Sequence, residues 1–286
     1  MLAYASLQAY ILPMANILPL EKRVAVIYAL AEGSSIRSIE RMTGVNRNTI
    51  MSLGLRVGEA CQAFMDEKLR NLTLENIQVD EIWGFIGKKQ RNVTTSDCST
   101  LGDVWTWIAM DRETKLVPSY IVGKRDTYHA QAFMYDLASK VANRPQISSD
   151  GLVAYVEAVE RGFGSDVHYG QVVKVYGASA FHPRKFSPPF VVAVDKTVVM
   201  GKPICSKIST SHVEKQNHTL RMHCRRLTRL TNGFSKKLEN FKAAVALNFW
   251  YYNFVKIHGS IRCTPAMAAG VSPSIRKVSD LIEMIK

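Results

Sequence analysis

The chain of 286 residues carries 37 Lys and Arg against 24 Asp and Glu, a formal net charge of +13, and 47% of its residues are hydrophobic. This hydrophobic share excludes a disordered chain, and the length is sufficient for one large or two smaller cores. Much of the charge lies between residues 205 and 262, which hold 11 Lys or Arg and only two acids, Glu214 and Glu239. We expect a polyanion such as nucleic acid as the partner, because each neutralised phosphate releases counterions.

The sequence predicts no membrane span. The apolar start, Met1 to Leu20, lacks a basic region and is interrupted by Pro13 and Pro19, and the apolar run Ala243 to Val255 is too short to cross a bilayer. An anionic membrane surface fits the charge less well than nucleic acid, because the aromatics of the basic segment have the pattern of a core. The five cysteines are scattered without a C-x-x-C pair, which is typical of free thiols in the cytoplasm.

The first part of the chain has helical periodicity. A helix is expected from Leu20 to Leu30, followed by two short helices around a turn at Gly44, which is the arrangement of a helix-turn-helix. Asn46 can cap the second of these helices. Its polar residues available for phosphates or base edges are Arg47, Asn48 and Arg56. A generic helical hairpin with a solvated basic face remains the alternative.

After about residue 72 the period changes to the alternation of strands. Strands are predicted at 77–87, 104–110, 116–122, 145–149 and 171–176, with helices at 127–141 and 152–160. This order is that of an α/β ribonuclease-H-like fold. Pro118 places the third strand at or near an edge. The Pro- and Gly-rich stretch from Gly177 to Pro203 is predicted to be an irregular insertion, and 238–258 a largely buried helix.

A single amphipathic helix is predicted from Ser209 to Arg229. Counting from Glu214, one face of this helix carries Asn217, His218, Arg221 and Arg225. A carboxylate therefore lies at the head of a basic face. The alternative is that Ser211 and Glu214 form a capping box with no further role.

Three acids lie on separate elements. Asp80 is inside the first strand, Asp150 is at the end of the fourth, and Glu214 is on the later helix, whereas Glu81 should point away from Asp80 by strand alternation. Neighbouring parallel strands would bring Asp80 and Asp150 together at their carboxyl ends. Carboxylates are costly to hold close without cations, and hard oxygen ligands favour Mg²⁺ or Mn²⁺, with two ions expected. The histidines have no zinc-site spacing.

The chain resembles a known family, the DDE transposases of bacterial and archaeal insertion sequences, of the insertion-sequence-one type. The motifs that carry the resemblance cover almost the whole chain: LPLEKRV at 18–24, VDEIWGF at 79–85, GDVWTW at 102–107, SDG at 149–151, STSHVEKQN at 209–217, LTRLTNGFSKK at 227–237 and TPAMAAGV at 264–271. The resemblance implies a helix-turn-helix for the terminal inverted repeats and a catalytic domain with Asp80, Asp150 and Glu214 as metal-binding triad. It also implies that Arg221 contacts DNA phosphate near the cut.

The chain departs from the family pattern at Lys215, where Arg is expected after the Glu, and in its apolar leader before Met14. We expect Met14 to be the start of translation or the leader to be dispensable. The expected organisation is a leader at 1–17, a helix-turn-helix domain at 18–72, the catalytic domain at 73–258 with its insertion at about 177–205, and a helical tail at 259–286.

The partners that follow from this interpretation are double-stranded DNA, both the terminal repeats and the target, and further copies of the chain assembled on that DNA. A cytoplasmic, nucleoid-associated protein is expected. Two alternatives remain: a non-catalytic helix-turn-helix protein that only binds DNA, and a ribonuclease-H-like nuclease that never joins strands.

Overall fold

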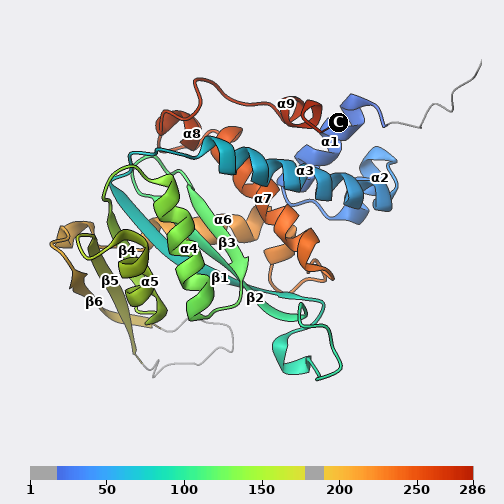
Figure 1. Ribbon diagram of the computed structural model, residues 1–286. Helices are drawn as coiled ribbons and strands as arrows, with labels where there is room; N and C mark the ends of the chain where they lie inside the picture. The colour runs from blue at the N-terminus through green and yellow to red at the C-terminus, as the bar shows by residue number, and fades with distance from the viewer. Residues whose placement is uncertain (1–17, 178–189, 286) are drawn as a thin grey trace, which may run out of the picture.

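The computed structural model describes residues 18–177 and 190–285. Its centre is one mixed six-stranded sheet with helices on both faces (Figure 1). The leader and the proposed start at Met14 lie outside the described residues. Among the described residues, no helix is long and apolar enough to span a membrane.

The sheet has the strand order β3-β2-β1-β4-β5-β6. Its strands are β1 Asn76–Ile86, β2 Gly102–Asp111, β3 Ser119–Gly123, β4 Gln146–Asp150, β5 His168–Gly177 and β6 Phe190–Met200. The first three pair antiparallel, β4 is parallel to both β1 and β5, and β6 returns antiparallel to β5. This order is consistent with a ribonuclease-H-like fold, and it confirms the predicted mixed α/β class. Pro118 precedes β3, which is the edge strand that the sequence predicted.

The helices following the central strands divide between the two faces of the sheet. They are α4 Thr127–Lys140, α5 Ala154–Phe163, α6 Ser211–His223 and α7 Leu238–Phe254. The buried Trp107 of β2 packs against Phe133 of α4 and Tyr155 of α5, with ring centroids 6.2 and 5.4 Å apart, so α4 and α5 share one face. On the opposite face, α6 lies against β1 and β2 (Figure 1).

The N-terminal helices are α1 Leu20–Ala31, α2 Ile36–Thr43 and α3 Arg47–Lys68. Ser35 caps α2 by accepting a hydrogen bond from the Ser38 amide, and Gly44 ends it in the left-handed conformation at φ +68°. Asn46 caps α3 through the Asn48 amide, as predicted. The second helix of the predicted pair is longer than a short helix-turn-helix element, because α3 runs for 22 residues to Lys68.

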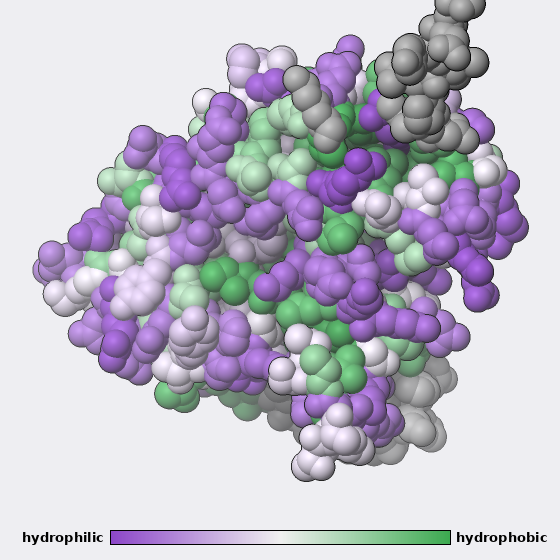
Figure 2. Space-filling model, turned by 45° about the vertical axis from the view of Figure 1, so that its right-hand side comes forward, coloured by the Kyte–Doolittle hydropathy of each residue, from purple (hydrophilic) through white to green (hydrophobic). Residues whose placement is uncertain are grey.

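The N-terminal helices and the sheet share one continuous buried core. Helix α3 packs along α7, and the C-terminal helices α8 Pro265–Ala268 and α9 Val278–Glu283 return the chain to α1 (Figure 1). Polar side chains cover most of the face in Figure 2, and apolar ones emerge only in small patches between them. The helical region is thereby fixed directly to the sheet domain.

Two sequence expectations are wrong. The irregular insertion predicted from Gly177 to Pro203 is wrong for residues 190–200, which form the strand β6 and pair with β5 with two register shifts, and its part at 178–189 lies outside the described residues. The prolines and glycines flanking this β-branched run obscured it. The predicted helix to Arg229 ends at His223, because Cys224 is extended and Arg225 begins a 3-10 turn, Arg225–Leu227. Arg225 is therefore not on the α6 face.

The contact between α3 and α7 generates a stability prediction. A Cβ added at Gly58 would lie 2.5 Å from the Cα and carbonyl oxygen of Ala243, so the backbones must separate to accept it. We expect Gly58→Ala to lower the free energy of unfolding by about 1–3 kcal/mol, although Ala has the higher helix propensity. Chemical denaturation of the full chain measures this change.

Gly54→Ala is the matched control, because the same helix holds Gly54 and its added Cβ meets only the flexible end of Leu30, at 3.2 Å. Its stability should stay the same or rise by up to about 1 kcal/mol. Equal losses in the two variants would contradict the close packing at Gly58.

Candidate metal and nucleic-acid site

Asp80 lies within β1, and Asp150 ends the neighbouring parallel strand β4. In the β1–β4 ladder Asn76 pairs with Gln146 and Gln78 with Ser148, and the same register carried two residues further sets Asp80 opposite Asp150. Asp150 also accepts a hydrogen bond from the Leu152 amide at 3.0 Å, which fixes its carboxylate at the start of the loop to α5. The parallel pairing thus places both acids together, as predicted.

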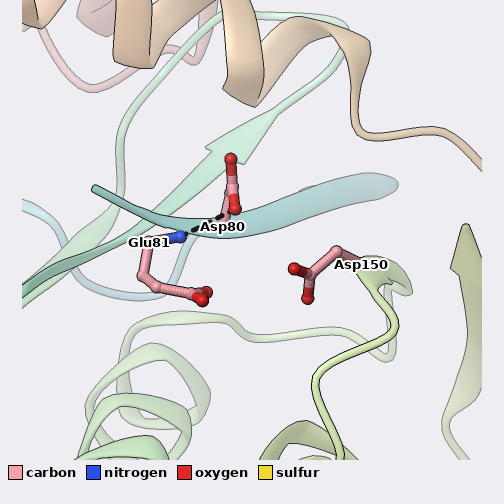
Figure 3. A group of neighbouring side chains, drawn as sticks. All are labelled: Asp80, Glu81 and Asp150. Atoms are coloured by element: carbon pink, nitrogen blue, oxygen red, sulfur yellow. Dashed lines mark hydrogen bonds between the residues drawn. The ribbon is translucent and has the colours of Figure 1, made fainter. Parts of the chain in front are cut away.

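Glu81 belongs to this cluster, contrary to the sequence expectation. Strand alternation does give Asp80 and Glu81 partners on opposite faces, since Asp80 accepts a hydrogen bond from Asn217 of α6 and Glu81 one from Tyr155 of α5. Nevertheless, carboxylate oxygens of Asp80, Glu81 and Asp150 all lie within 4.8 Å of one another. Figure 3 shows the Glu81 and Asp150 carboxylates turned toward each other, with Asp80 on the other side of β1. Glu81 is therefore not an inert neighbour of the site.

The electrostatics of the cluster favour a cation. Burial, together with the charges of Glu81, Asp150 and Glu214, raises the pKa of Asp80 to about 7, against the opposing hydrogen bond from the Glu81 amide. Burial and the charge of Asp150 likewise raise the pKa of Glu81, whereas Arg125 lowers it through a 2.7 Å ion pair. A divalent cation between these carboxylates would remove their mutual repulsion.

Helix α6 is held over Asp80 by a side chain of β1. The Gln78 Oε1 accepts hydrogen bonds from the His212 and Val213 amides at 2.8 and 3.2 Å, so it caps the N-terminus of α6. One turn further on, the Asn217 Nδ2 donates to Asp80 at 2.8 Å. The Oδ1 of Asn217 is buried and has no hydrogen-bond partner among the described residues. That oxygen is a further acceptor beside the acids.

Glu214 lies on the first turn of α6, beside the cluster but outside it. Lys174 of β5 donates to both of its carboxylate oxygens at 2.6 Å, and Thr210 donates to one of them at 2.6 Å. The N-cap residue is Thr210, which makes no side-chain capping bond, so the capping box suggested for Ser211 and Glu214 is not formed. Lys174 therefore occupies the position beside the Glu214 carboxylate that a bound metal ion would need.

The other candidate residues divide by exposure. Those at the surface are Arg47, Asn48, Arg56 and His218. Arg221 is half-buried and donates to the carbonyls of Leu227 and Trp83 at 3.1 and 3.4 Å, and burial lowers its pKa to about 10. Arg225 is also half-buried, on the 3-10 turn after α6. The phosphate contact suggested for Arg221 stays a prediction.

The residues present fit Mg²⁺ or Mn²⁺. Three carboxylates with converging oxygens and an unpartnered amide oxygen form an all-oxygen donor set, which such hard cations prefer. Asp80 and Asp150 would hold the ion, with Glu81 on one side and Glu214 with Asn217 on the other. Sequence reasoning missed Glu81 and Lys174; the pairing of Lys174 with Glu214 becomes visible only when β5 is placed next to α6.

No protein-family model matches the chain, and no curated protein matches it in sequence. Among solved structures, the Mos1 transposase paired-end complex with the left transposon end is similar at 12% identity and a TM-score of 0.20, over 51% of this chain and 58% of that one. The Mos1 strand transfer complex is similar at 10% identity and a TM-score of 0.22, over 83% of this chain and 78% of that one. The first match spans little more than half of the Mos1 chain. Both likenesses are too weak to support an inference, so the fold assignment follows from the chain's own strand order.

The Lys174–Glu214 pair generates a prediction about metal affinity. If Lys174 competes with a cation for Glu214, Lys174→Ala should tighten Mn²⁺ binding by roughly threefold to tenfold, because one nearby positive charge is removed. Titration of the full chain with Mn²⁺, monitored by electron paramagnetic resonance of the ion, measures the free and the bound Mn²⁺ directly.

Lys196→Ala is the control, since Lys196 pairs opposite Val172, carries the same charge and lies one strand further out. Its effect should stay below about twofold. Equal tightening in both variants would show that only net charge matters and that Lys174 does not compete for Glu214.

Proposed function

We propose that this protein is a DDE-type DNA transposase of the insertion-sequence-one type, which recognises the ends of its element and catalyses metal-dependent cleavage and strand transfer. The observation that carries the proposal is the convergence of Asp80, within β1, and Asp150, at the end of the parallel strand β4, with α6 bonded to Asp80 through Asn217. The motifs that resemble the family contain all three of these residues. The strand order supports the same proposal.

Asp80, Asp150 and Glu214 are assigned as metal ligands, and two Mg²⁺ or Mn²⁺ ions are expected. When bound, these ions supply Lewis-acid chemistry that activates an attacking oxygen and stabilises the leaving oxygen of a phosphodiester. Glu214 would join the ligand set on separating from Lys174, whose ammonium group would then be available to a DNA phosphate. Asn217 orients Asp80 through its amide.

The reaction assigned to the site has two steps of the same kind. Water first attacks the phosphodiester at the element end, breaks its P–O3′ bond and frees a 3′-hydroxyl. This hydroxyl then attacks a phosphodiester of the target DNA, forms a new P–O bond and displaces the 3′-oxygen of the target strand. Both steps need double-stranded DNA held over the acids, which the basic segment around α6 favours. Two ends must meet for strand transfer, so we propose an oligomer on DNA.

Recognition of the element ends is assigned to α2 and the first half of α3. Arg47, Asn48 and Arg56 are exposed there. An exposed helix after a tight turn is the element that other helix-turn-helix proteins place in the major groove. The phosphate-facing residues assigned beside the acids are His218 and Arg221, whereas Arg225 lies off the α6 face on the following 3-10 turn.

The catalytic assignment is tested by Asp80→Asn and Asp150→Asn. Each should reduce Mg²⁺-dependent cleavage of end-repeat DNA by at least about a thousandfold, because metal catalysis supplies several kcal/mol of transition-state stabilisation. DNA binding should survive, and Glu214→Gln should behave in the same way. Product analysis on sequencing gels measures cleavage and joining in one assay.

Glu160→Gln is the matched control, an exposed acid of α5 that should leave activity unchanged. Near-normal cleavage by either Asp variant would remove that residue from the ligand set. A wild-type chain that binds end DNA without cutting it would be a non-catalytic DNA-binding protein. The ion pair between Glu214 and Lys174 is the observation that favours this alternative. Cleavage without joining would identify a nuclease.

The recognition assignment is tested by Arg47→Ala and Asn48→Ala. Loss of a base contact should weaken binding to end DNA by about 1–3 kcal/mol and relax specificity at one position. Lys68→Ala, at the far end of the same helix, should leave end binding unchanged. Competition binding with end DNA and unrelated DNA measures both effects, and equal losses on the two DNAs would show that the residues only contact phosphates.

A further inference from the structure

A cavity of about 450 Å³ lies where α1, α2 and α3 meet α7 and the 3-10 turn after α6. It is separate from the acid cluster, since none of its lining residues belongs to that site. Pockets of this size hold small organic ligands rather than a DNA duplex. The residues that line the cavity indicate what kind of ligand it binds.

The lining is strongly basic. It contains three arginines, Arg37, Arg225 and Arg226, and no Asp or Glu. Among the described residues none of the three is in an ion pair, and the Nε of Arg225 is buried without a hydrogen-bond partner. Arg226 uses one nitrogen on the Gly233 carbonyl at 3.3 Å. Arginines that line one cavity without an acidic partner favour the binding of an anion there.

This basic lining is specific to one side of α3. A second cavity of about 570 Å³ on the other side of α3 and α7 is lined by the acids Glu59, Asp66 and Glu239, with Lys242 as its cation. The two cavities share Leu55 and Ala243, so they are neighbours with opposite charge. The arginines are therefore not a general property of the helical region.

The remaining lining residues suit a flat ring with polar edges. Ile50 and Met51 of α3 and Leu247 of α7 supply apolar surface, and Asn232 and Asn240 supply amides that can both donate and accept hydrogen bonds. A nucleobase needs apolar contacts on its faces and amide partners on its edge, and its attached phosphate needs Arg. We propose that this cavity binds a single nucleotide unit.

The nucleotide has two possible sources with the same chemistry, a free mononucleotide and an unpaired nucleotide of a DNA strand. Nucleotide binding in this cavity is independent of the proposed transposase activity and is measured by binding alone. Isothermal titration calorimetry of the full chain with dAMP, dGMP, dCMP and dTMP should show saturable one-to-one binding of at least one of them. Inorganic phosphate should bind at least about tenfold more weakly, because it lacks the base.

Two variants test the location of the site. Arg37→Ala removes an exposed cation at the cavity, and Ala244→Met fills the cavity from α7 without changing any charge. Each should weaken mononucleotide binding at least about tenfold, while circular dichroism confirms the fold. Arg144→Ala, an exposed arginine far along the chain, is the charge-matched control and should change binding less than about twofold.

The outcome for Ala244→Met decides between a cavity and general electrostatic attraction. Unchanged binding in Ala244→Met, or no saturable mononucleotide binding in the wild type, would overturn the proposal. Competition by duplexes with and without an unpaired terminal nucleotide distinguishes the sources. Displacement of the bound mononucleotide only by the duplex with the unpaired nucleotide assigns the site to DNA, and no displacement by either duplex assigns it to a free nucleotide.

Discussion

The hydrogen bonds from Gln78 to the first turn of α6 connect the two parts of the candidate site. Gln78 lies on β1, two residues before Asp80, and its Oε1 accepts from the His212 and Val213 amides. These amides have no partner within the helix, so the cap satisfies them and fixes where α6 begins. With α6 fixed there, Asn217 reaches Asp80 and Glu214 lies at the edge of the acid cluster. The site therefore depends on one buried amide side chain that carries no charge.

The distribution of cations around the four acids is uneven. Glu81 is paired with Arg125 and Glu214 with Lys174, so the two outer acids each have a positive partner from the protein. Asp80 and Asp150 have no such partner among the described residues, and their hydrogen bonds come from amides only. The inner pair is thus the place where a bound cation gains most. The arrangement supports Asp80 and Asp150 as the main ligands and Glu214 as one that must first leave Lys174.

The sequence predicted what depends on local pattern. Alternation located the first five strands, and the position of Asp80 within one strand and Asp150 at the end of another correctly placed the two acids together. It did not predict contacts between elements that are distant in the sequence. Lys174 contacts Glu214 because the fold brings β5 and α6 close together. Arg221 donates to the Trp83 carbonyl because α6 crosses β1. Strand β6 was missed because the flanking Gly and Pro suggested a loop. Glu81 was placed on the correct face, but the length of its side chain brings its carboxylate back to the cluster.

Diffraction from crystals soaked in Mn²⁺ tests directly whether Asp80 and Asp150 hold a divalent cation. We expect an anomalous peak within about 2.0–2.6 Å of a carboxylate oxygen from each of the two residues. Glu214 should be separated from Lys174 in that state. An empty acid cluster at saturating Mn²⁺, or a peak bound only by other residues, would show that Asp80 and Asp150 do not form the metal site.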